Sequence, residues 1–175
     1  MNLPNLTFVL GGAASGKSAF AENLCLRCGL ARVYIATSQI YDDEMRAKVD
    51  RHKAQRGDDW HTIEEPLLLA DHLAGFDANH VILIDCATLW LSNVMLGEHD
   101  LAAQTQTLLT AIKAADAPVV IVSNEVGHGI VPDNALARQF RNAQGRLNQD
   151  IAAQAAVVVN VIAGLPQVLK GQLPQ

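Results

Sequence analysis

The chain has 175 residues, of which 50% are apolar and 5% aromatic, and its formal net charge at pH 7 is −5. This length predicts one domain over residues 1–175, and the acidic balance argues against nucleic acid or an anionic membrane as partner. No apolar run reaches the roughly 18 residues of a membrane span. Three cysteines without a disulfide framework, and no basic and apolar leader, predict a cytoplasmic protein.

The first predicted strand, residues 6–10, runs into the motif G-x-x-x-x-G-K-S and then into a helix-favouring stretch. Strand, glycine-rich loop and helix form the context in which this motif binds phosphate. Glycines let successive N–H groups turn toward an anion, and the helix adds its positive N-terminal end. We expect Lys17 to reach the β- and γ-phosphates and Ser18 to ligate Mg²⁺. The predicted nucleotide contacts are Gly11, Gly12, Ala13, Ala14, Ser15, Gly16, Lys17 and Ser18.

A short apolar strand is predicted at residues 33–36, and it is followed by two hydroxyl side chains. Ligands of parallel sheets bind beyond the carboxyl ends of the strands. Ala36, Thr37 and Ser38 are therefore candidates to line the nucleotide site. A cap for the following helix is the alternative role of these hydroxyls.

A charged helix is predicted over residues 42–55, and His52 lies in it among Arg51, Lys53 and Arg56. On these residues alone two interpretations stay open. Basic residues near a helix C-terminus are favoured by the helix dipole and often form only a solvated end. An imidazole among cations is also a candidate functional group.

The second strong motif is an apolar strand at residues 81–84 that ends in Asp85. This is the Walker B pattern, in which the carboxylate holds Mg²⁺ directly or through water. A short strand at 60–64 and a helix at 67–73 precede it. The run 89–96 is apolar almost all round, so it is either a buried helix or an oligomer surface.

The second half continues the alternation of helices and strands. Helices are predicted at 101–114 and 134–155, buried strands at 118–123 and 156–162, and an edge strand at 167–170. The residues expected on the core face of the last helix are Leu136, Phe140, Leu147 and Ile151. With the phosphate loop, this alternation predicts the α/β class: a P-loop NTPase with a mostly parallel sheet and helices on both faces.

Together these motifs resemble the bifunctional adenosylcobinamide kinase / adenosylcobinamide-phosphate guanylyltransferases of cobalamin biosynthesis, over nearly the whole chain. Many proteins share the phosphate loop, but the other segments are more specific. They are Y-I-A-T-S at 34–38, D-D-E-M at 42–45, H-K-x-x-R at 52–56, W-x-T-x-E at 60–64, N-E-V-G-x-G-I-V-P at 124–132 and R-x-x-x-G-R-x-N-Q at 141–149. The resemblance implies a RecA-like form of the P-loop fold.

The resemblance also implies roles for single residues. Members of the family guanylylate a histidine in the helix after the second strand, and His52 matches that position, so His52 and Lys17 become the expected catalytic residues. A variant of the motif has two adjacent histidines, whereas Arg51 precedes His52 here. The family's GTP site further implicates Lys53, Ala54, Gln55, Arg56, Glu64 and Asp85, and its Mg²⁺ would be held by Ser18 and Asp85.

The activities that the resemblance implies are two. Adenosylcobinamide is phosphorylated with ATP or GTP, and GMP then passes from GTP to adenosylcobinamide phosphate through a guanylyl-histidine, with release of pyrophosphate. Family behaviour implies a homo-oligomer, a trimer. One alternative is a monofunctional small-molecule kinase without a covalent intermediate. Another is a RecA-like ATPase module acting on nucleic acid or as a partner switch, which the acidic charge disfavours.

Overall fold

The computed structural model describes residues 1–39 and 59–174, and one seven-stranded sheet forms its centre. The strands lie in the order β3-β2-β4-β5-β1-β6-β7. Their bounds are β1 Leu6–Gly11, β2 Ala31–Ala36, β3 Trp60–Glu64, β4 His80–Asp85, β5 Val119–Asn124, β6 Val157–Ile162 and β7 Leu165–Lys170. Strands β1 to β6 pair in parallel, and β7 pairs antiparallel with β6. The prediction of a mostly parallel sheet is confirmed.

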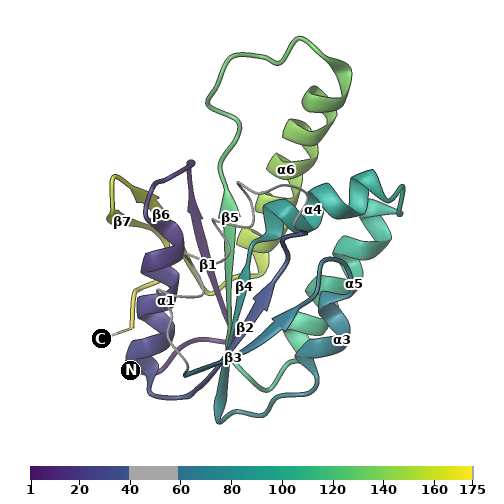
Figure 1. Ribbon diagram of the computed structural model, residues 1–175. Helices are drawn as coiled ribbons and strands as arrows, with labels where there is room; N and C mark the ends of the chain where they lie inside the picture. The colour runs from purple at the N-terminus through teal and green to yellow at the C-terminus, as the bar shows by residue number, and fades with distance from the viewer. Residues whose placement is uncertain (40–58, 175) are drawn as a thin grey trace.

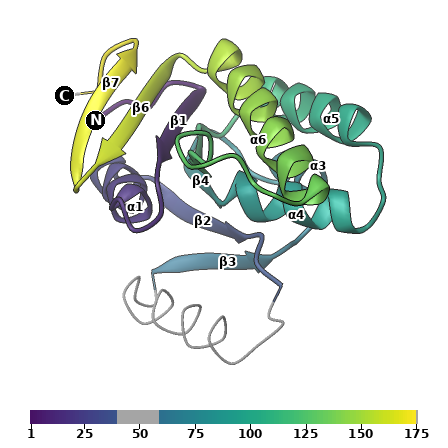
Figure 2. The ribbon, with the colours of Figure 1, turned by 90° about the horizontal axis from the view of Figure 1, so that it is seen from above.

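Helices cover both faces of this sheet, as Figure 1 and Figure 2 show. Their bounds are α1 Lys17–Cys28, α3 Leu69–Leu73, α4 Ala87–Leu96, α5 Leu101–Ala114 and α6 Ala135–Gln154. In Figure 2, α1 lies on one side of the sheet and the other four lie on the opposite side. Within the described ranges, no helix has the length and apolar character needed to cross a membrane. The helix predicted at 42–55 lies outside the described residues.

The central strands are buried on both faces. In β4 the side chains of Val81, Ile82, Leu83 and Ile84 are all 0% exposed. Ile82 and Ile84 pack in the cluster under α3 to α6, whereas Val81 and Leu83 pack in the cluster under α1. A strand covered by helices on both sides needs apolar residues at every position. This explains the unbroken apolar run that precedes Asp85.

The apolar run at 89–96 forms a buried helix, α4. Trp90, Leu91 and Val94 are at most 1% exposed and belong to the hydrophobic cluster on the face of the sheet covered by α3 to α6. The helix is most exposed at its end, where Leu96 is 66% exposed. Of the two interpretations of this run, the described residues therefore support the buried helix.

The core face predicted for α6 is wrong at its first position. Leu147 and Ile151 are buried and Phe140 packs against the core, but Leu136 is 57% exposed. Figure 1 shows the reason, because the first turns of α6 extend past the carboxyl ends of the strands and have no sheet beneath them. Helical periodicity identifies the face of a helix but not where along its length the core ends.

Helix α4 also fastens the loops that follow β2 and β3. The buried amide of Asn93 donates through Nδ2 to the carbonyl of Thr37 at 2.8 Å and to that of Pro66 at 3.0 Å. The indole of Trp90 donates to the carbonyl of Leu67 at 2.9 Å. Two segments at the carboxyl edge of the sheet are thus held by one helix.

We expect Asn93→Ala to lower the free energy of unfolding by about 1–3 kcal/mol, because two carbonyl groups would lose their buried donor. Urea denaturation measures this change. Asn142→Ala, at an exposed position of α6, is the matched control and is expected to stay within about 0.5 kcal/mol of the parent. Equal effects of the two substitutions would contradict the anchoring role.

Candidate functional site

The phosphate loop curls between the last residue of β1 and the first residue of α1. Inside the loop, the N–H of Ser15 donates to the carbonyl of Gly12 at 3.3 Å. The Lys17 ammonium donates to the same carbonyl at 3.0 Å, and this side chain is only 9% exposed. The Lys17 ammonium is therefore held against the loop, on the side where the motif binds phosphate.

Two glycines of this loop have no substitute. A Cβ on Gly11 would collide with the hydroxyl of Ser15 and would lie 2.7 Å from the carbonyl oxygen of Val161. Gly16 caps α1 with a φ of 91°, a left-handed conformation that side chains rarely adopt. The N–H of Gly164, in the turn between β6 and β7, donates to the carbonyl of Ser15 at 2.8 Å. The loop is thus braced from the adjacent hairpin.

Register brings the other predicted site residues to the same edge of the sheet. Ala36, the last residue of β2, pairs with Glu64 on one side and with Asp85 on the other. Gly11, where the phosphate loop begins, pairs with Asn124 at the end of β5. Parallel strands bind ligands at this edge, and four predicted site segments meet there. Their contacts with a nucleotide stay a prediction.

The Asp85 carboxylate is oriented by a neighbouring strand. The hydroxyl of Tyr34 on β2 donates to its Oδ2 at 2.9 Å. Oxygen donors such as this carboxylate and the Ser18 hydroxyl suit Mg²⁺. Within residues 1–39 and 59–174, no group of three or more His, Cys, Asp or Glu side chains could hold a metal. A site with only one or two protein ligands agrees with Mg²⁺, because this ion usually keeps several waters and binds substrate phosphates.

Thr37 ties the end of β2 to the start of α4. Its hydroxyl, 0% exposed, donates to the carbonyl of Cys86 at 2.8 Å and accepts from the N–H of Cys86 at 2.7 Å. These bonds join Thr37 to Cys86 and not to the helix predicted after it, and a contact of Thr37 with nucleotide stays a prediction. Ser38 is half-buried beside it. Burial, reinforced by the Asp85 carboxylate, raises the pKa of the Cys86 thiol to about 11, so this thiol is neutral beside the site.

A buried polar network, absent from the predictions, supports the end of β5. Asn148 accepts at Oδ1 from Ser123 at 2.7 Å and from Gln144 at 2.9 Å, and Gln144 also donates to Ser123 at 2.9 Å. Thr88 of α4 accepts from the N–H of Asn124 at 2.8 Å. Positions 144, 147, 148 and 151 lie on one face of a helix. Counting amide side chains as possible core residues would therefore have identified Gln144 and Asn148 from the sequence.

Glu65, the neighbour of the predicted GTP contact Glu64, caps the loop before α3. Its Oε1 accepts from the N–H groups of Leu67 at 2.9 Å and Leu68 at 2.8 Å, and its Oε2 lies 3.2 Å from Nε2 of His72. Burial raises the pKa of this carboxyl, but these three hydrogen bonds more than offset it, and the pKa lies below its ordinary value. Glu64 itself is exposed at the end of β3.

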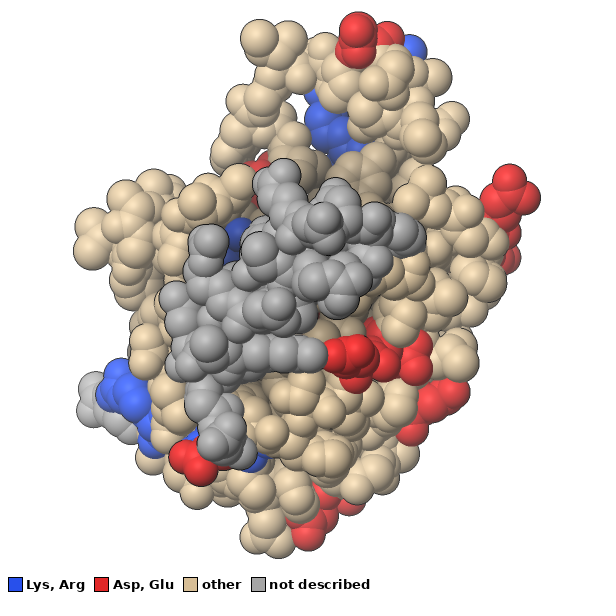
Figure 3. Space-filling model, in the orientation of Figure 1, with Lys and Arg blue, Asp and Glu red and all other residues tan. Residues whose placement is uncertain are grey.

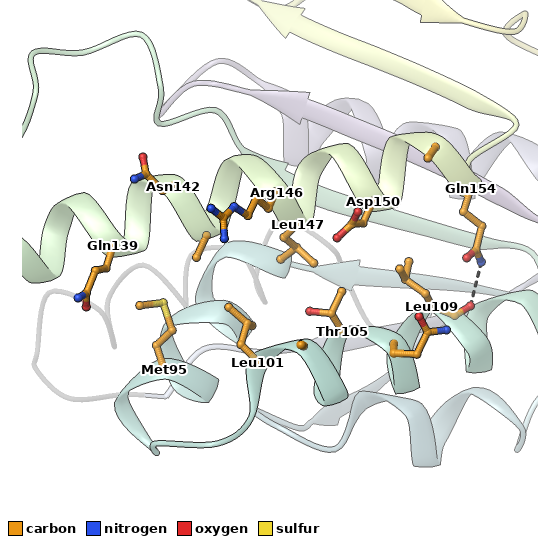
Figure 4. Close-up of a pocket in the computed structure, with 14 residues that line it drawn as sticks. Met95, Leu101, Thr105, Leu109, Gln139, Asn142, Arg146, Leu147, Asp150 and Gln154 are labelled. Carbon is orange, nitrogen blue, oxygen red and sulfur yellow. Dashed lines mark hydrogen bonds between the residues drawn. The ribbon is translucent and has the colours of Figure 1, made fainter.

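His52, Lys53, Ala54, Gln55 and Arg56 lie outside the described residues, so their roles stay predictions. A groove of 820 Å³ lies between α5 and α6 on the described surface. Figure 4 shows Leu101, Leu109 and Leu147 along it, with Gln154 bonded to the Leu109 carbonyl at 2.9 Å at one end. None of the described residues predicted for the nucleotide site lines it. The groove lies on the face of the sheet opposite α1.

Residues 7–169 match a family model described as cobinamide kinase / cobinamide phosphate guanyltransferase. The chain belongs to this family. It is 42% identical over 167 residues to the bifunctional adenosylcobalamin biosynthesis protein CobP of Pseudomonas aeruginosa, covering 94% of this chain and 96% of that protein. It is 39% identical over 176 residues to the CobU protein of the same description from Escherichia coli, covering 91% and 97%.

A solved structure gives the fold alone. An ATPase of the type III secretion system of pathogenic bacteria superposes with a TM-score of 0.58 at 10% identity, covering 96% of this chain and 57% of that one. The cobinamide kinase / guanylyltransferase chain is thus a P-loop NTPase, an α/β enzyme of cobalamin biosynthesis with both activities. The resemblance inferred from its motifs is confirmed.

Glu65→Gln provides a test of the cap through its dependence on pH. A carboxyl whose pKa is lowered by folding stabilises the fold above its unfolded pKa, and this stabilisation disappears as the pH falls through the folded pKa. We expect the parent to be more stable than the variant near neutral pH and the difference to vanish in acid. Urea titrations from neutral pH into acid measure the difference in the free energy of unfolding. Glu98→Gln, at an exposed carboxylate, is the control. A difference that persists in acid would exclude the carboxylate as its cause.

Proposed function

We propose that this chain, a cytoplasmic enzyme with one nucleotide-binding domain over residues 1–175, carries out two successive transfers. It phosphorylates a hydroxyl of adenosylcobinamide with ATP or GTP. It then transfers GMP from GTP to adenosylcobinamide phosphate, giving adenosylcobinamide-GDP and pyrophosphate. The observation that supports this best is the register that places Asp85 and Glu64 beside Ala36, at the edge where the phosphate loop also opens.

In the kinase step, the terminal phosphoryl group passes from the triphosphate to the substrate hydroxyl. The loop N–H groups and the Lys17 ammonium bind the phosphates and reduce the repulsion that an approaching oxygen meets. Mg²⁺, held by Ser18 and Asp85, would neutralise charge on the same phosphates when bound. The Tyr34 hydroxyl, 2.9 Å from Oδ2 of Asp85, keeps this carboxylate in one orientation.

In the guanylyl step, His52 is the nucleophile. A ring nitrogen attacks the α-phosphorus of GTP, an N–P bond forms, and the bond to the β-phosphate breaks with release of pyrophosphate. A phosphate oxygen of adenosylcobinamide phosphate then displaces the imidazole. The attacking nitrogen must be unprotonated, and the neighbouring cations Arg51 and Lys53 favour the neutral ring. Lys53, Ala54, Gln55 and Arg56, with Ala36, Thr37, Ser38 and Glu64, would complete the GTP site.

We expect His52→Ala to abolish transfer of GMP and to leave phosphorylation of cobinamide near the parent rate, since only the second reaction needs the imidazole. Mass spectrometry of protein treated with GTP and Mg²⁺ should find added GMP on the peptide that contains His52. His61→Ala, an exposed histidine of β3, is the matched control and should keep the adduct. A parent protein that transfers GMP without forming any adduct would contradict the guanylyl-histidine intermediate.

Lys17→Ala should damage both reactions, because one phosphate loop serves both. The lost contact is a charge-assisted hydrogen bond, so we expect each rate to fall by about 10²-fold or more. Steady-state assays of phosphorylation and of GMP transfer measure the two rates separately. Parent rates for both would remove the loop from the mechanism.

We also propose that the chain forms a homo-oligomer, a trimer as the resemblance implies. The support is an exposed apolar cluster beyond the carboxyl ends of the strands, where Ile130, Val131 and Leu136 are 95%, 61% and 57% exposed. Ile130→Asp should lower the molar mass measured by light scattering. Leu96→Asp, at an isolated exposed leucine, should leave it unchanged. A parent protein of monomer mass would refute the proposal.

The charge distribution bears on the partners. On the face shown in Figure 3, the described basic side chains do not join into a continuous patch, and acidic side chains lie between them. The formal net charge of −5 supports small-molecule substrates over nucleic acid, which would need a basic surface.

A further inference from the structure

The strand β5 occupies a special place in the sheet. It lies between β1, which carries the phosphate loop, and β4, which ends in Asp85. Asp85 pairs with Val122, so β5 continues two residues past the end of β4 and finishes at Asn124. Asn124 in turn pairs with Gly11, the first residue of the loop. The last residue of β5 therefore stands between the two phosphate-binding motifs.

The side chain of Asn124 lies on the face of the sheet that carries α1. Successive side chains of a strand alternate between faces, and in β5 Val120 and Val122 pack in the cluster under α1, whereas Ile121 packs in the opposite one. Asn124 follows Val122 by two positions and shares its face. By the same alternation Asp85 shares the face of Leu83, which packs under α1. The Asn124 amide and the Asp85 carboxylate thus both border the N-terminal end of α1.

The backbone around Asn124 is held on three sides. Its N–H donates to Oγ1 of Thr88 at 2.8 Å, and its carbonyl accepts from Nδ2 of Asn148 at 3.1 Å. The next N–H, that of Glu125, donates to the carbonyl of Gly11 at 3.0 Å. These partners come from α4, α6 and β1, so three separate elements converge on one residue.

Holding Asn124 in this way requires polar groups in the protein interior. Ser123 and Gln144 are 0% exposed, and Thr88 and Asn148 are 6% and 7% exposed. Burial of polar side chains is unfavourable unless their hydrogen bonds are made, and apolar residues would fill this space more simply. Most of these polar groups are bonded to one another, while Oε1 of Gln144 has no hydrogen-bond partner among the described residues, and such a network favours one arrangement of the backbone. Here that arrangement holds the backbone of Asn124 beside the loop.

We propose that the Asn124 carboxamide donates a hydrogen bond to the terminal phosphate of the bound triphosphate, and that Thr88 and Asn148 are its positioning residues. An amide suits this place because it offers N–H donors without a negative charge, whereas a carboxylate would repel phosphate. In the kinase reaction, charge is spread over the terminal phosphoryl oxygens as the new O–P bond forms and the bond to the β-phosphate breaks. The inference rests on the proposed placement of the triphosphate over residues 11–18.

The test compares two ligands that differ only in the terminal phosphate, the α,β-methylene analogues of GTP and GDP, which cannot transfer GMP. Calorimetric titration with Mg²⁺ gives both dissociation constants. We expect Asn124→Ala to weaken triphosphate binding about tenfold, as loss of a hydrogen bond to a charged group does, and to leave diphosphate binding within about twofold. Asn124→Asp should weaken triphosphate binding further through repulsion. An unchanged preference for triphosphate over diphosphate in Asn124→Ala would overturn the proposal.

The positioning role has its own pair of variants. Thr88→Val removes the acceptor of the Asn124 N–H at nearly constant volume, and Thr88→Ser keeps it. We expect Thr88→Val to reduce the preference for triphosphate and Thr88→Ser to retain it. General destabilisation would weaken both ligands alike, so this ratio separates positioning from loss of structure. Equal ratios in the two variants would overturn the role of Thr88.

Lys17→Ala separates this inference from the proposed function. If it weakens both analogues while Asn124→Ala changes neither, the loop binds nucleotide and the assignment of Asn124 is wrong. If Lys17→Ala also binds both analogues like the parent, the placement of the triphosphate fails, and the inference fails with it. Asn142→Ala, an exposed asparagine of α6, is the matched control and should keep both affinities.

Discussion

The structure depends on the reversal of the chain between β1 and α1. Five residues, 12–16, must turn a buried strand into a helix whose first N–H groups point back over the sheet edge, and side chains limit that turn. Gly11 has no room for a Cβ between Ser15 and Val161, and Gly16 needs a positive φ. The Gly164 N–H holds the Ser15 carbonyl from the neighbouring hairpin. Once this turn is fixed, the N-terminal end of α1 and the Lys17 ammonium define where an anion can lie.

The remaining strands matter mainly through the level at which they end. In a parallel sheet, register decides which side chains share an edge, and here it aligns Ala36 with both Glu64 and Asp85. Strand β5 ends later than β4, so its last residue rises beside the loop. The polar groups placed there need support from below, which explains why the interior beneath them contains hydroxyls and amides. The apolar interior further down the sheet has no such need.

The sequence was sufficient for the parts of the fold that one local rule governs. Glycine-rich spacing identifies residues 11–18, Gly29 ends α1 in a left-handed conformation, and the apolar run before Asp85 forms a central strand. The sequence was insufficient where the polarity of a residue and its position on a helix face predict different burial. Gln144 and Asn148 are polar yet buried, because they bond Ser123 and Asn124 at the end of β5. Leu136 is apolar yet exposed, because α6 is longer than the surface it covers. Such outcomes depend on tertiary contacts that no periodicity contains.

One constraint also links the sheet to the predicted nucleophile, and it follows from chain length. The strand β3 begins at Trp60 near the amino edge and ends at Glu64 at the carboxyl edge, a rise of about 13 Å over four residue intervals. His52 precedes Asp59 by seven residues, and an extended chain of that length spans at most about 25 Å. The link is therefore long enough for His52 to reach the edge where the phosphate loop opens. Chain length therefore permits the position that the proposed transfer of GMP requires of His52.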